Sequence, residues 1–281
     1  VLDEKGQKMS KSKGNAVEPF STLEKYGADA TRWYMMSNSQ PWDNLKFDLN
    51  GLAETQRKFF GTLFNTYNFF ALYANIDGFQ QDEMNALPVE GRPEIDRWII
   101  SKLYSLVKEV TEAYTDYEPT KAARAIESFV SDELSNWYVR LCRRRFWKTD
   151  MSSDKQAAFE TLYQALMMTN QLMAPIAPFF SEWMYKNMTD PIRDAAIANN
   201  TPLRHESIHL SHLTKVQEEY IDKYLEQRME YAQRISSLVL SLRKQSKNRV
   251  RQPLQKIGYT ILPPIPCFRL SVRWFLRRLL R

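Results

Sequence analysis

Apolar side chains recur every three or four residues along most of this chain, which is the spacing of one face of an α-helix. Residues 16–48 contain shorter, aromatic-rich pieces broken by prolines and a glycine, and they predict turns and short helices. Long helices joined by short breaks predict an all-α fold, a helical bundle. The predicted long helices cover residues 49–75, 94–114, 119–147, 154–173, 179–188 and 216–245.

The clearest candidate for a domain junction is residues 76–93, where glycines and prolines interrupt the helical spacing. This junction predicts a first region over residues 1–75 and a helical bundle over residues 94–245. A basic C-terminal segment, residues 246–281, follows the bundle.

Composition excludes several classes of protein. The 281 residues are 43% hydrophobic and 13% aromatic, which is ample for a packed core and excludes a disordered tail. No stretch of 18 or more residues is apolar throughout, and no charged N-terminal region precedes an apolar run. We therefore expect neither a membrane span nor a signal peptide, and a cytoplasmic location.

Few residues in the sequence are suited to binding a metal. Cys142 and Cys267 are the only cysteines and neither belongs to a C-x-x-C pair. His205, His209 and His212 are spaced closely enough to suggest a metal site, but the last two flank leucines, so we predict an ordinary surface strand or turn there. The sequence therefore predicts no structural metal.

Charge is distributed unevenly along the chain. The net charge of +6 conceals a segment, residues 231–281, with 12 Lys and Arg and no Asp or Glu. Residues 1–230 consequently carry a net charge of −6. A basic end of this kind is typical of nucleic-acid binding or of a solvated tail.

Candidate chemistry appears first at residues 8–15, which have the sequence KMSKSKGN. Lys8 and Lys11 lie three residues apart in a turn rich in serine and glycine. Two ammonium groups on such a loop can meet phosphate oxygens as charge develops during transfer, so the loop is suited to a polyphosphate. For a generic pair of lysines at this spacing, a solvated turn is the alternative.

A basic stripe is predicted on the helix at residues 132–148, DELSNWYVRLCRRRFWK. Apolar side chains, among them Leu134 and Tyr138, fall on one side of this helix, and a polar set falls on the opposite side. Guanidinium groups stack on bases and bind phosphates, and Phe146 and Trp147 offer stacking surfaces. Solvated arginines beside a buried Trp137 remain an alternative. The polar set consists of Asn136, Arg140, Arg143 and Arg144.

These motifs together resemble one family. The string at residues 8–15, continued by YGADATR at residues 26–32, resembles the signature loop of class I aminoacyl-tRNA synthetases and the segment after it. LSNWYVRLCRRRFW at residues 134–147 is similar to the anticodon-domain helix of the isoleucyl members. The resemblance extends to about residue 257 and implies a helical anticodon-binding bundle preceded by a connecting region that carries the loop.

The resemblance implies roles for the loop. ATP, with Mg²⁺, is the implied cofactor, and isoleucine is activated to an adenylate before transfer to its tRNA. Lys11 is the catalytic residue that neutralises phosphate charge and Lys8 assists it. The implied ATP-binding residues are Lys8, Met9, Ser10, Lys11 and Ser12.

The resemblance also implies a tRNA partner, the isoleucine acceptor. The RNA-facing role falls on Asn136, Arg140, Arg143, Arg144 and Arg145. The family's HIGH signature, its nucleotide-binding sheet and its amino-acid pocket are not found in these residues, so we expect a C-terminal fragment that is not catalytic alone. Two alternatives stay open: a fragment of a valyl-tRNA synthetase and a stand-alone tRNA-binding module.

The match to the family ends after about residue 257. Residues 258–281 contain five arginines and no lysine or acidic residue. We expect an artefactual end rather than an RNA-binding arm. The arginines that fall at near-helical spacing there are Arg269, Arg273, Arg277 and Arg278.

Overall fold

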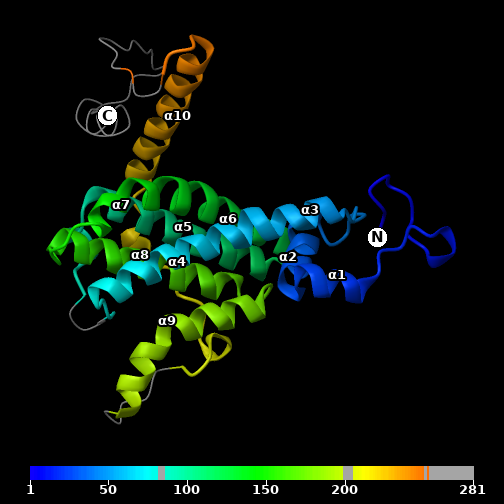
Figure 1. Cartoon of the computed structure of the whole chain (residues 1–281), viewed down its shortest axis with the longest axis horizontal. Helices are drawn as coiled ribbons and strands as arrows, with labels where there is room; N and C mark the ends of the chain where they lie inside the picture. The colour runs from blue at the N-terminus through cyan, green and yellow to red at the C-terminus, as the bar shows by residue number, and fades with distance from the viewer. Residues whose placement is uncertain (82–85, 199–204, 250–251, 253–281) are drawn as a thin grey trace. The chain divides into compact units, whose positions relative to one another are not determined.

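The computed structural model describes residues 1–81, 86–198, 205–249 and 252. These residues form a set of α-helices (Figure 1), and within them only isolated β-bridges occur, which join Leu2 to Lys8 and to Lys46. The all-α prediction is confirmed. The α-helices are α1 (Pro19–Tyr26), α2 (Ala28–Asn38), α3 (Leu49–Glu54), α4 (Gly61–Asp77), α5 (Glu94–Thr115), α6 (Pro119–Ser128), α7 (Arg140–Phe146), α8 (Ser153–Met173), α9 (Pro178–Ala198) and α10 (Lys223–Gln245).

Two of the predicted long helices contain a π-helical segment. Segment η2 (Thr55–Phe60) joins α3 to α4, and segment η4 (Phe129–Val139) joins α6 to α7. Each pair is one continuous helix in space, as the apolar spacing predicts. The wider π turns were not foreseen, because one extra residue per turn hardly changes a pattern of apolar positions.

The chain divides into two compact units, residues 1–221 and residues 222–281. In the first unit, α5 and α8 pack side by side, and α4, α6 and η4 pack against them. The core includes Trp98 and Phe159, both at most 1% exposed. Because α4 packs directly on α8, the predicted junction at residues 76–93 lies inside this unit.

The second unit is described from α10. Asp222 begins this helix, because its carboxylate accepts a hydrogen bond from the backbone N–H of Leu225 at 2.9 Å. The helix therefore starts at Lys223, seven residues after the predicted start at residue 216. The basic residues of segment 253–281 lie outside the described part of the chain.

Helix α9 runs ten residues past its predicted end at residue 188. The apolar spacing stops there, but polar contacts continue the helix: the Thr189 hydroxyl donates to the backbone oxygen of Tyr185 at 2.8 Å, and Arg193 pairs with Asp190 at 3.4 Å.

Across the described residues, no helix has both the length and the apolar character needed to cross a membrane.

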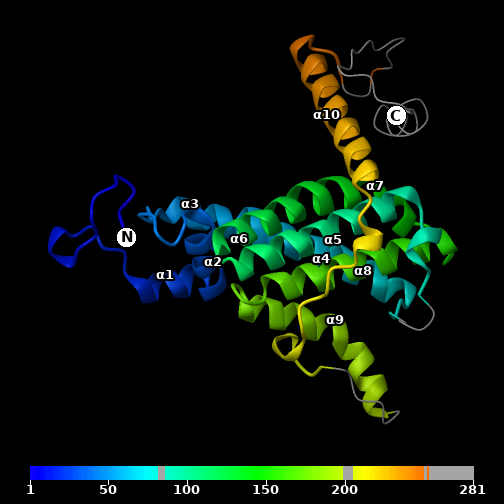
Figure 2. The ribbon, with the colours of Figure 1, turned by 180° about the vertical axis from the view of Figure 1, so that it is seen from behind.

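Helix α2, which follows the lysine loop and α1, is fastened to the bundle on two sides. Its Trp33 Nε1 donates to Glu127 of α6 at 2.7 Å, and Asp29 accepts from the backbone N–H of Phe180 in α9 at 2.6 Å. Arg32 donates to the backbone oxygen of Ile176 at 3.0 Å. Figures 1 and 2 both show α2 beside α6, so the bundle sets the orientation of the second helix after the loop.

Candidate functional site

The lysine loop, residues 8–15, is built around a single 3₁₀ turn, Lys11–Lys13. Ser10 begins this turn, because its hydroxyl accepts a hydrogen bond from the backbone N–H of Lys13 at 3.3 Å. Gly14 ends it with φ of 65°, a conformation that glycine adopts without strain. The side chains of Lys8, Lys11 and Ser12 are consequently exposed, whereas Met9 and Ser10 are half-buried.

Asn15 holds the two ends of the loop together. Its Oδ1 accepts from the backbone N–H of Ser10 at 2.9 Å, and its Nδ2 donates to Asp3 Oδ2 at 2.9 Å and to the backbone oxygen of Lys8 at 3.3 Å. The hydrogen bond from Asn15 is the main cause of a lowered pKa of Asp3, and the N–H of Gln7 adds to it. Sequence reasoning gave Asn15 no role, although a side-chain amide that both donates and accepts suits this position.

The loop can offer positive charge without first breaking an ion pair. Among the described residues, no carboxylate lies within ion-pair distance of Lys8 or Lys11. Ammonium groups on long stems can reach phosphate oxygens, so this donor set fits a polyphosphate.

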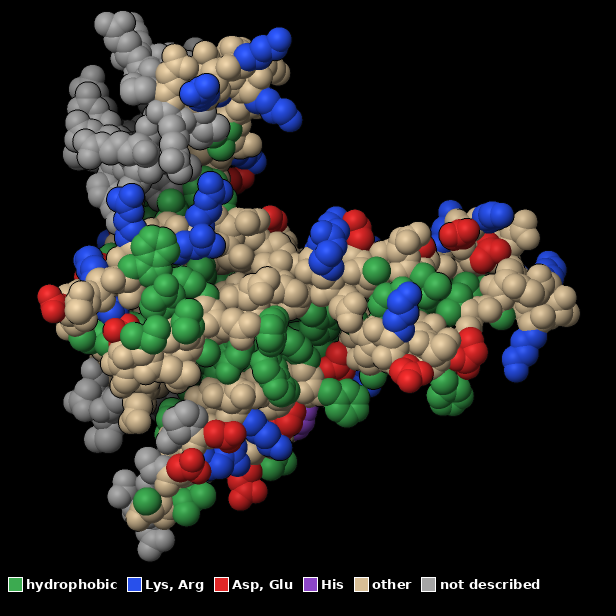
Figure 3. All heavy atoms as spheres, viewed as in Figure 1, with side chains coloured by type: hydrophobic (Ala, Val, Ile, Leu, Met, Phe, Trp, Pro, Cys, Tyr) green, Lys and Arg blue, Asp and Glu red, His purple; other side chains and the backbone are tan. Residues whose placement is uncertain are grey.

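The basic stripe lies on η4 and α7. Asn136, Arg140, Arg143 and Arg144 are all exposed. Figure 3 shows Lys and Arg side chains gathered over α7 beside a patch of hydrophobic side chains. Trp147, which follows α7, is 57% exposed, so an aromatic surface lies at the end of the stripe.

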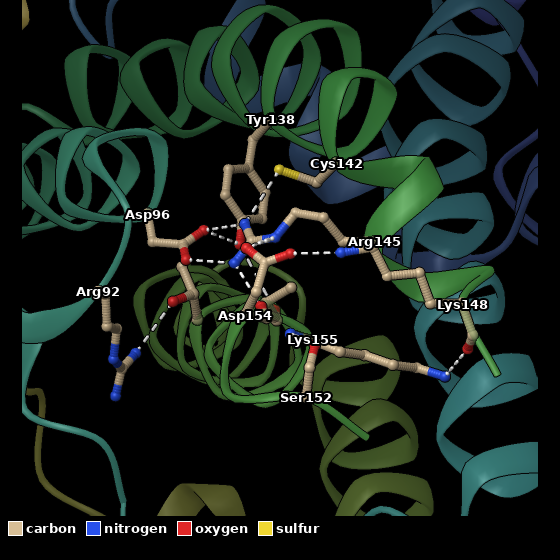
Figure 4. Close-up of polar contacts among 11 residues, drawn as sticks. Arg92, Asp96, Tyr138, Cys142, Arg145, Lys148, Ser152, Asp154 and Lys155 are labelled. Carbon is tan, nitrogen blue, oxygen red and sulfur yellow. Dashed lines mark hydrogen bonds and ion pairs between the residues drawn. The ribbon is translucent and has the colours of Figure 1, made fainter. Parts of the chain in front are cut away.

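Arg145 is placed differently from the sequence-based expectation. We expected it to face RNA, but its side chain is 4% exposed and bound to Asp96 at 2.6 Å and to Asp154 at 2.9 Å (Figure 4). On the helix its side chain projects about 200° around the axis from that of Arg143 and about 100° from that of Arg144, which turns it from the exposed face toward the core. We therefore leave Arg145 out of the RNA-facing set.

Phe146 also belongs to the core. The prediction that it offers a stacking surface is wrong, since the residue is 1% exposed and its ring packs edge-on against Phe69 and Phe159, with centroids 5.1 and 4.9 Å away. Leu134 and Tyr138 are fully buried, as the helical spacing predicts. Burial raises the pKa of Tyr138, whose hydroxyl donates to Asp96 at 2.8 Å.

The described histidines, cysteine and carboxylates do not gather in groups of three that could hold a metal ion. His209 belongs to a single 3₁₀ turn, Ile208–Leu210, and its Nε2 lies 3.1 Å from the backbone oxygen of Pro178. The turn predicted here thus agrees with the structure at His209.

Two family models match the chain. Residues 96–257 match the anticodon-binding domain of tRNA ligase, and residues 1–48 match tRNA synthetases class I (I, L, M and V). The chain belongs to the class I tRNA ligases. The basic stripe lies within the first match and the lysine loop within the second, which confirms the resemblance to the family.

The chain matches isoleucine–tRNA ligases over most of its length. It is 55% identical over 264 residues to the isoleucine–tRNA ligase of Cytophaga hutchinsonii. The matched residues make up 94% of this chain and 23% of that relative. It is 41% identical over 254 residues to the isoleucine–tRNA ligase of Thermus thermophilus, and the matched residues make up 90% of this chain and 23% of that relative. These identities favour the isoleucyl branch over the valyl alternative. The chain spans about a quarter of the length of these relatives.

A solved structure shares the fold. The Agrobacterium radiobacter K84 LeuRS–tRNA–LeuAMS ternary complex contains a chain that superimposes with a TM-score of 0.55 at 18% identity, covering 78% of this chain and 23% of that chain. At this identity, the similarity concerns the arrangement of helices.

Proposed function

We propose that this chain is part of an isoleucine–tRNA ligase. In this ligase the bundle binds the anticodon region of the tRNA, and the lysine loop assists ATP-dependent formation of isoleucyl-adenylate in the cytoplasm. The observation that carries the proposal is the row of exposed arginines on α7, within the part of the chain that matches an anticodon-binding domain. The lysine loop belongs to the same compact unit.

Binding of RNA is assigned to the face that carries Asn136, Arg140, Arg143 and Arg144. Guanidinium groups bind phosphate oxygens through two parallel hydrogen bonds, and the Asn136 amide can donate to and accept from a base edge. The affinity should fall steeply with salt, since each neutralised phosphate releases a counterion.

The loop acts in the first chemical step of the ligase. Isoleucine and ATP give the adenylate and pyrophosphate, and the acyl group then passes to the terminal ribose of the tRNA. Lys11 neutralises charge that develops on the phosphates, Lys8 assists it, and Met9, Ser10 and Ser12 shape the loop around them. Mg²⁺ bound with the nucleotide would supply further positive charge there.

Binding of tRNA is the direct test. The affinity of the chain for an isoleucine tRNA transcript is measured at about 50 and 200 mM salt, with a valine tRNA for comparison. Replacing Arg140, Arg143 and Arg144 together by alanine should weaken binding and lower the slope of log affinity against log salt by about one per lost contact. Replacing Arg57 and Lys58, exposed cations on η2, should leave both unchanged. Binding that is indifferent to salt would contradict the proposal, and tighter binding of the valine tRNA would favour the valyl alternative.

Catalysis is tested by complementation. The chain alone should show no isoleucine-dependent pyrophosphate exchange, and adding the remaining part of a related isoleucine–tRNA ligase should restore it. Lys11→Ala should then lower the rate by about 10²–10³-fold, the usual effect of losing one donor to a developing charge. Affinity for isoleucine should hardly change. Full function without the added part would instead favour a stand-alone module.

A further inference from the structure

The turn between α7 and α8, residues 147–152, is fastened by two buried cations. Arg145 comes just before this α7–α8 turn and Lys155 just after it, and their side chains are 4% and 1% exposed. Figure 4 shows the Arg145 side chain directed toward Asp96 and Asp154, and the Lys155 side chain directed toward Lys148. Buried cations are rare in folded proteins unless they are paired, so their partners indicate what they do.

Arg145 donates from two edges of its planar guanidinium group. Its Nη1 and Nη2 bind the two carboxylate oxygens of Asp96, on α5, at 2.6 and 2.7 Å. Its Nη2 also donates to the backbone oxygen of Asp154 at 2.6 Å, and its Nε lies 2.9 Å from Oδ1 of the same residue. The guanidinium thereby joins the start of α8 to α5.

Lys155 holds the other end of the turn. Its ammonium donates to the backbone oxygen of Lys148 at 2.5 Å and pairs with Asp77, the last residue of α4, at 2.7 Å. Ser152 begins α8 by accepting from the backbone N–H of Lys155 at 3.3 Å. The carbonyl groups of Lys148 and Asp154 thus both accept from a buried cation.

The outer side of the turn carries Trp147 and Lys148. The indole is 57% exposed, and the ammonium of Lys148 lies 3.1 Å from Asp154 Oδ2. Trp147 continues the exposed stripe of Arg143 and Arg144. An exposed indole at the end of a cationic stripe combines the two groups that bind unpaired nucleotides, since bases stack on the ring and phosphates meet the arginines.

Buried ion pairs contribute little net stability compared with an apolar core, so the geometry they impose is the more informative property. We propose that Arg145 and Lys155 are positioning residues that hold Trp147 ready to stack on an unpaired base of the bound tRNA. The proposal rests on the proposed function. A turn fixed before binding loses less entropy when the RNA arrives.

The test compares four variants of the whole chain. Arg145→Lys keeps the charge beside Asp96 but cannot span Asp96 and Asp154 together, because an ammonium lacks the planar fork. Trp147→Ala removes the ring, and the double variant combines both changes. Arg92→Lys is the matched control, since Arg92 is an equally buried partner of Glu160 on α8, at 3.1 Å, away from the turn. Each is titrated with an RNA hairpin of the anticodon-arm sequence and with a duplex RNA that has no unpaired bases.

Arg145→Lys and Trp147→Ala should each weaken hairpin binding about tenfold, the contribution of one stacked base. The double variant should be no weaker than Trp147→Ala, because Arg145 acts through the ring. Arg92→Lys should bind the hairpin like the unchanged chain, and none of the four changes should alter duplex binding.

Additive losses in the double variant, or an equal loss in Arg92→Lys, would overturn the proposal. If Arg145→Lys fails to fold, Asp77→Asn replaces it, since it weakens the hold on Lys155 and should lower hairpin affinity in the same direction. If Trp147→Ala has no effect while the triple arginine variant still weakens binding, the positioning proposal fails and the proposed function stands. If the triple variant has no effect either, the proposed function fails.

Discussion

The lysine loop and the α7–α8 turn both present cations on a short non-helical segment, but they are held in opposite ways. In the loop, the neutral amide of Asn15 and the carboxylate of Asp3 hold the backbone near the surface. In the turn, two cations that are almost fully buried hold the backbone from below.

The difference matches the task proposed for each segment. Hydrogen bonds near the surface contribute little net free energy, so the loop can adjust to charge that moves during a reaction. Cations paired inside the core cannot be released without leaving a buried charge, so the turn keeps one geometry. A loop that must adjust to moving charge during a reaction benefits from conformational freedom. A surface that recognises RNA benefits from a single fixed geometry.

The largest expected effect comes from breaking the anchor of the turn. Asp96→Ala should lower the free energy of unfolding by about 3–5 kcal/mol, because it leaves Arg145 buried without its two-pronged partner. Urea denaturation measures this change. Asp3→Ala, at the anchor of the loop, is the comparison and should change global stability far less. Similar losses in the two variants would remove the distinction between the segments.

A smaller, local effect is expected at the loop. Asn15→Ala removes three hydrogen bonds and should favour local opening by about 1–3 kcal/mol, the penalty for unpaired polar groups. Hydrogen exchange at the Ser10 amide should speed up while global stability is unchanged. Asn187→Ala is the control: it removes one exposed hydrogen bond, from the Asn187 amide to the backbone oxygen of Trp183, and should leave hydrogen exchange in the loop unchanged. Loss of global stability in Asn15→Ala would show that the loop is not independent of the core.

These two segments also differ in how far sequence reasoning describes them. The exposure of Lys8, Lys11 and Arg140 follows from their polar character, and the spacing of Leu134 and Tyr138 predicts their burial. Arg145 does not follow, because it lies within a run of three arginines and only the position of Asp96, 49 residues earlier, selects it for the core. A long-range carboxylate cannot be paired with one particular arginine from a single sequence.

The contact between α2 and α6 gives a pH test. Burial raises the pKa of Glu127, which accepts from Trp33, above 4.5. The folded state therefore favours the protonated carboxyl, and the stability this contributes is present below pH 4.5 and lost as the pH rises through the raised pKa. Glu127→Gln keeps an acceptor without the charge, so its stability relative to the unchanged chain should increase as the pH rises above 4.5. A difference in urea denaturation that does not vary with pH would contradict this assignment.

The smallest effect is expected from titrating Asp3. Its pKa is lowered from 3.8, chiefly by the hydrogen bond from Asn15, so its contribution to loop order is present above pH 3.8 and lost as the pH falls through the lowered pKa. The NMR shift of the Asn15 side-chain amide should follow this titration with a midpoint below 3.8. In Asn15→Ala, the midpoint of the Asp3 carboxyl should move back up. An unchanged midpoint would assign the shift to the backbone N–H groups instead.

The π-helical segment η4 has a consequence for how such a surface can evolve. It precedes α7 directly, and each residue of an α-helix turns the side chains that follow by about 100°. A single deletion within Phe129–Val139 that narrowed a π turn to an α turn would remove the residue that the wider turn absorbs and leave Arg140, Arg143 and Arg144 close to their present face, whereas a deletion in the α-helical part of the same helix would rotate them by about 100°. The π-helical segment is therefore a place where related proteins could gain or lose one residue without redirecting these arginines.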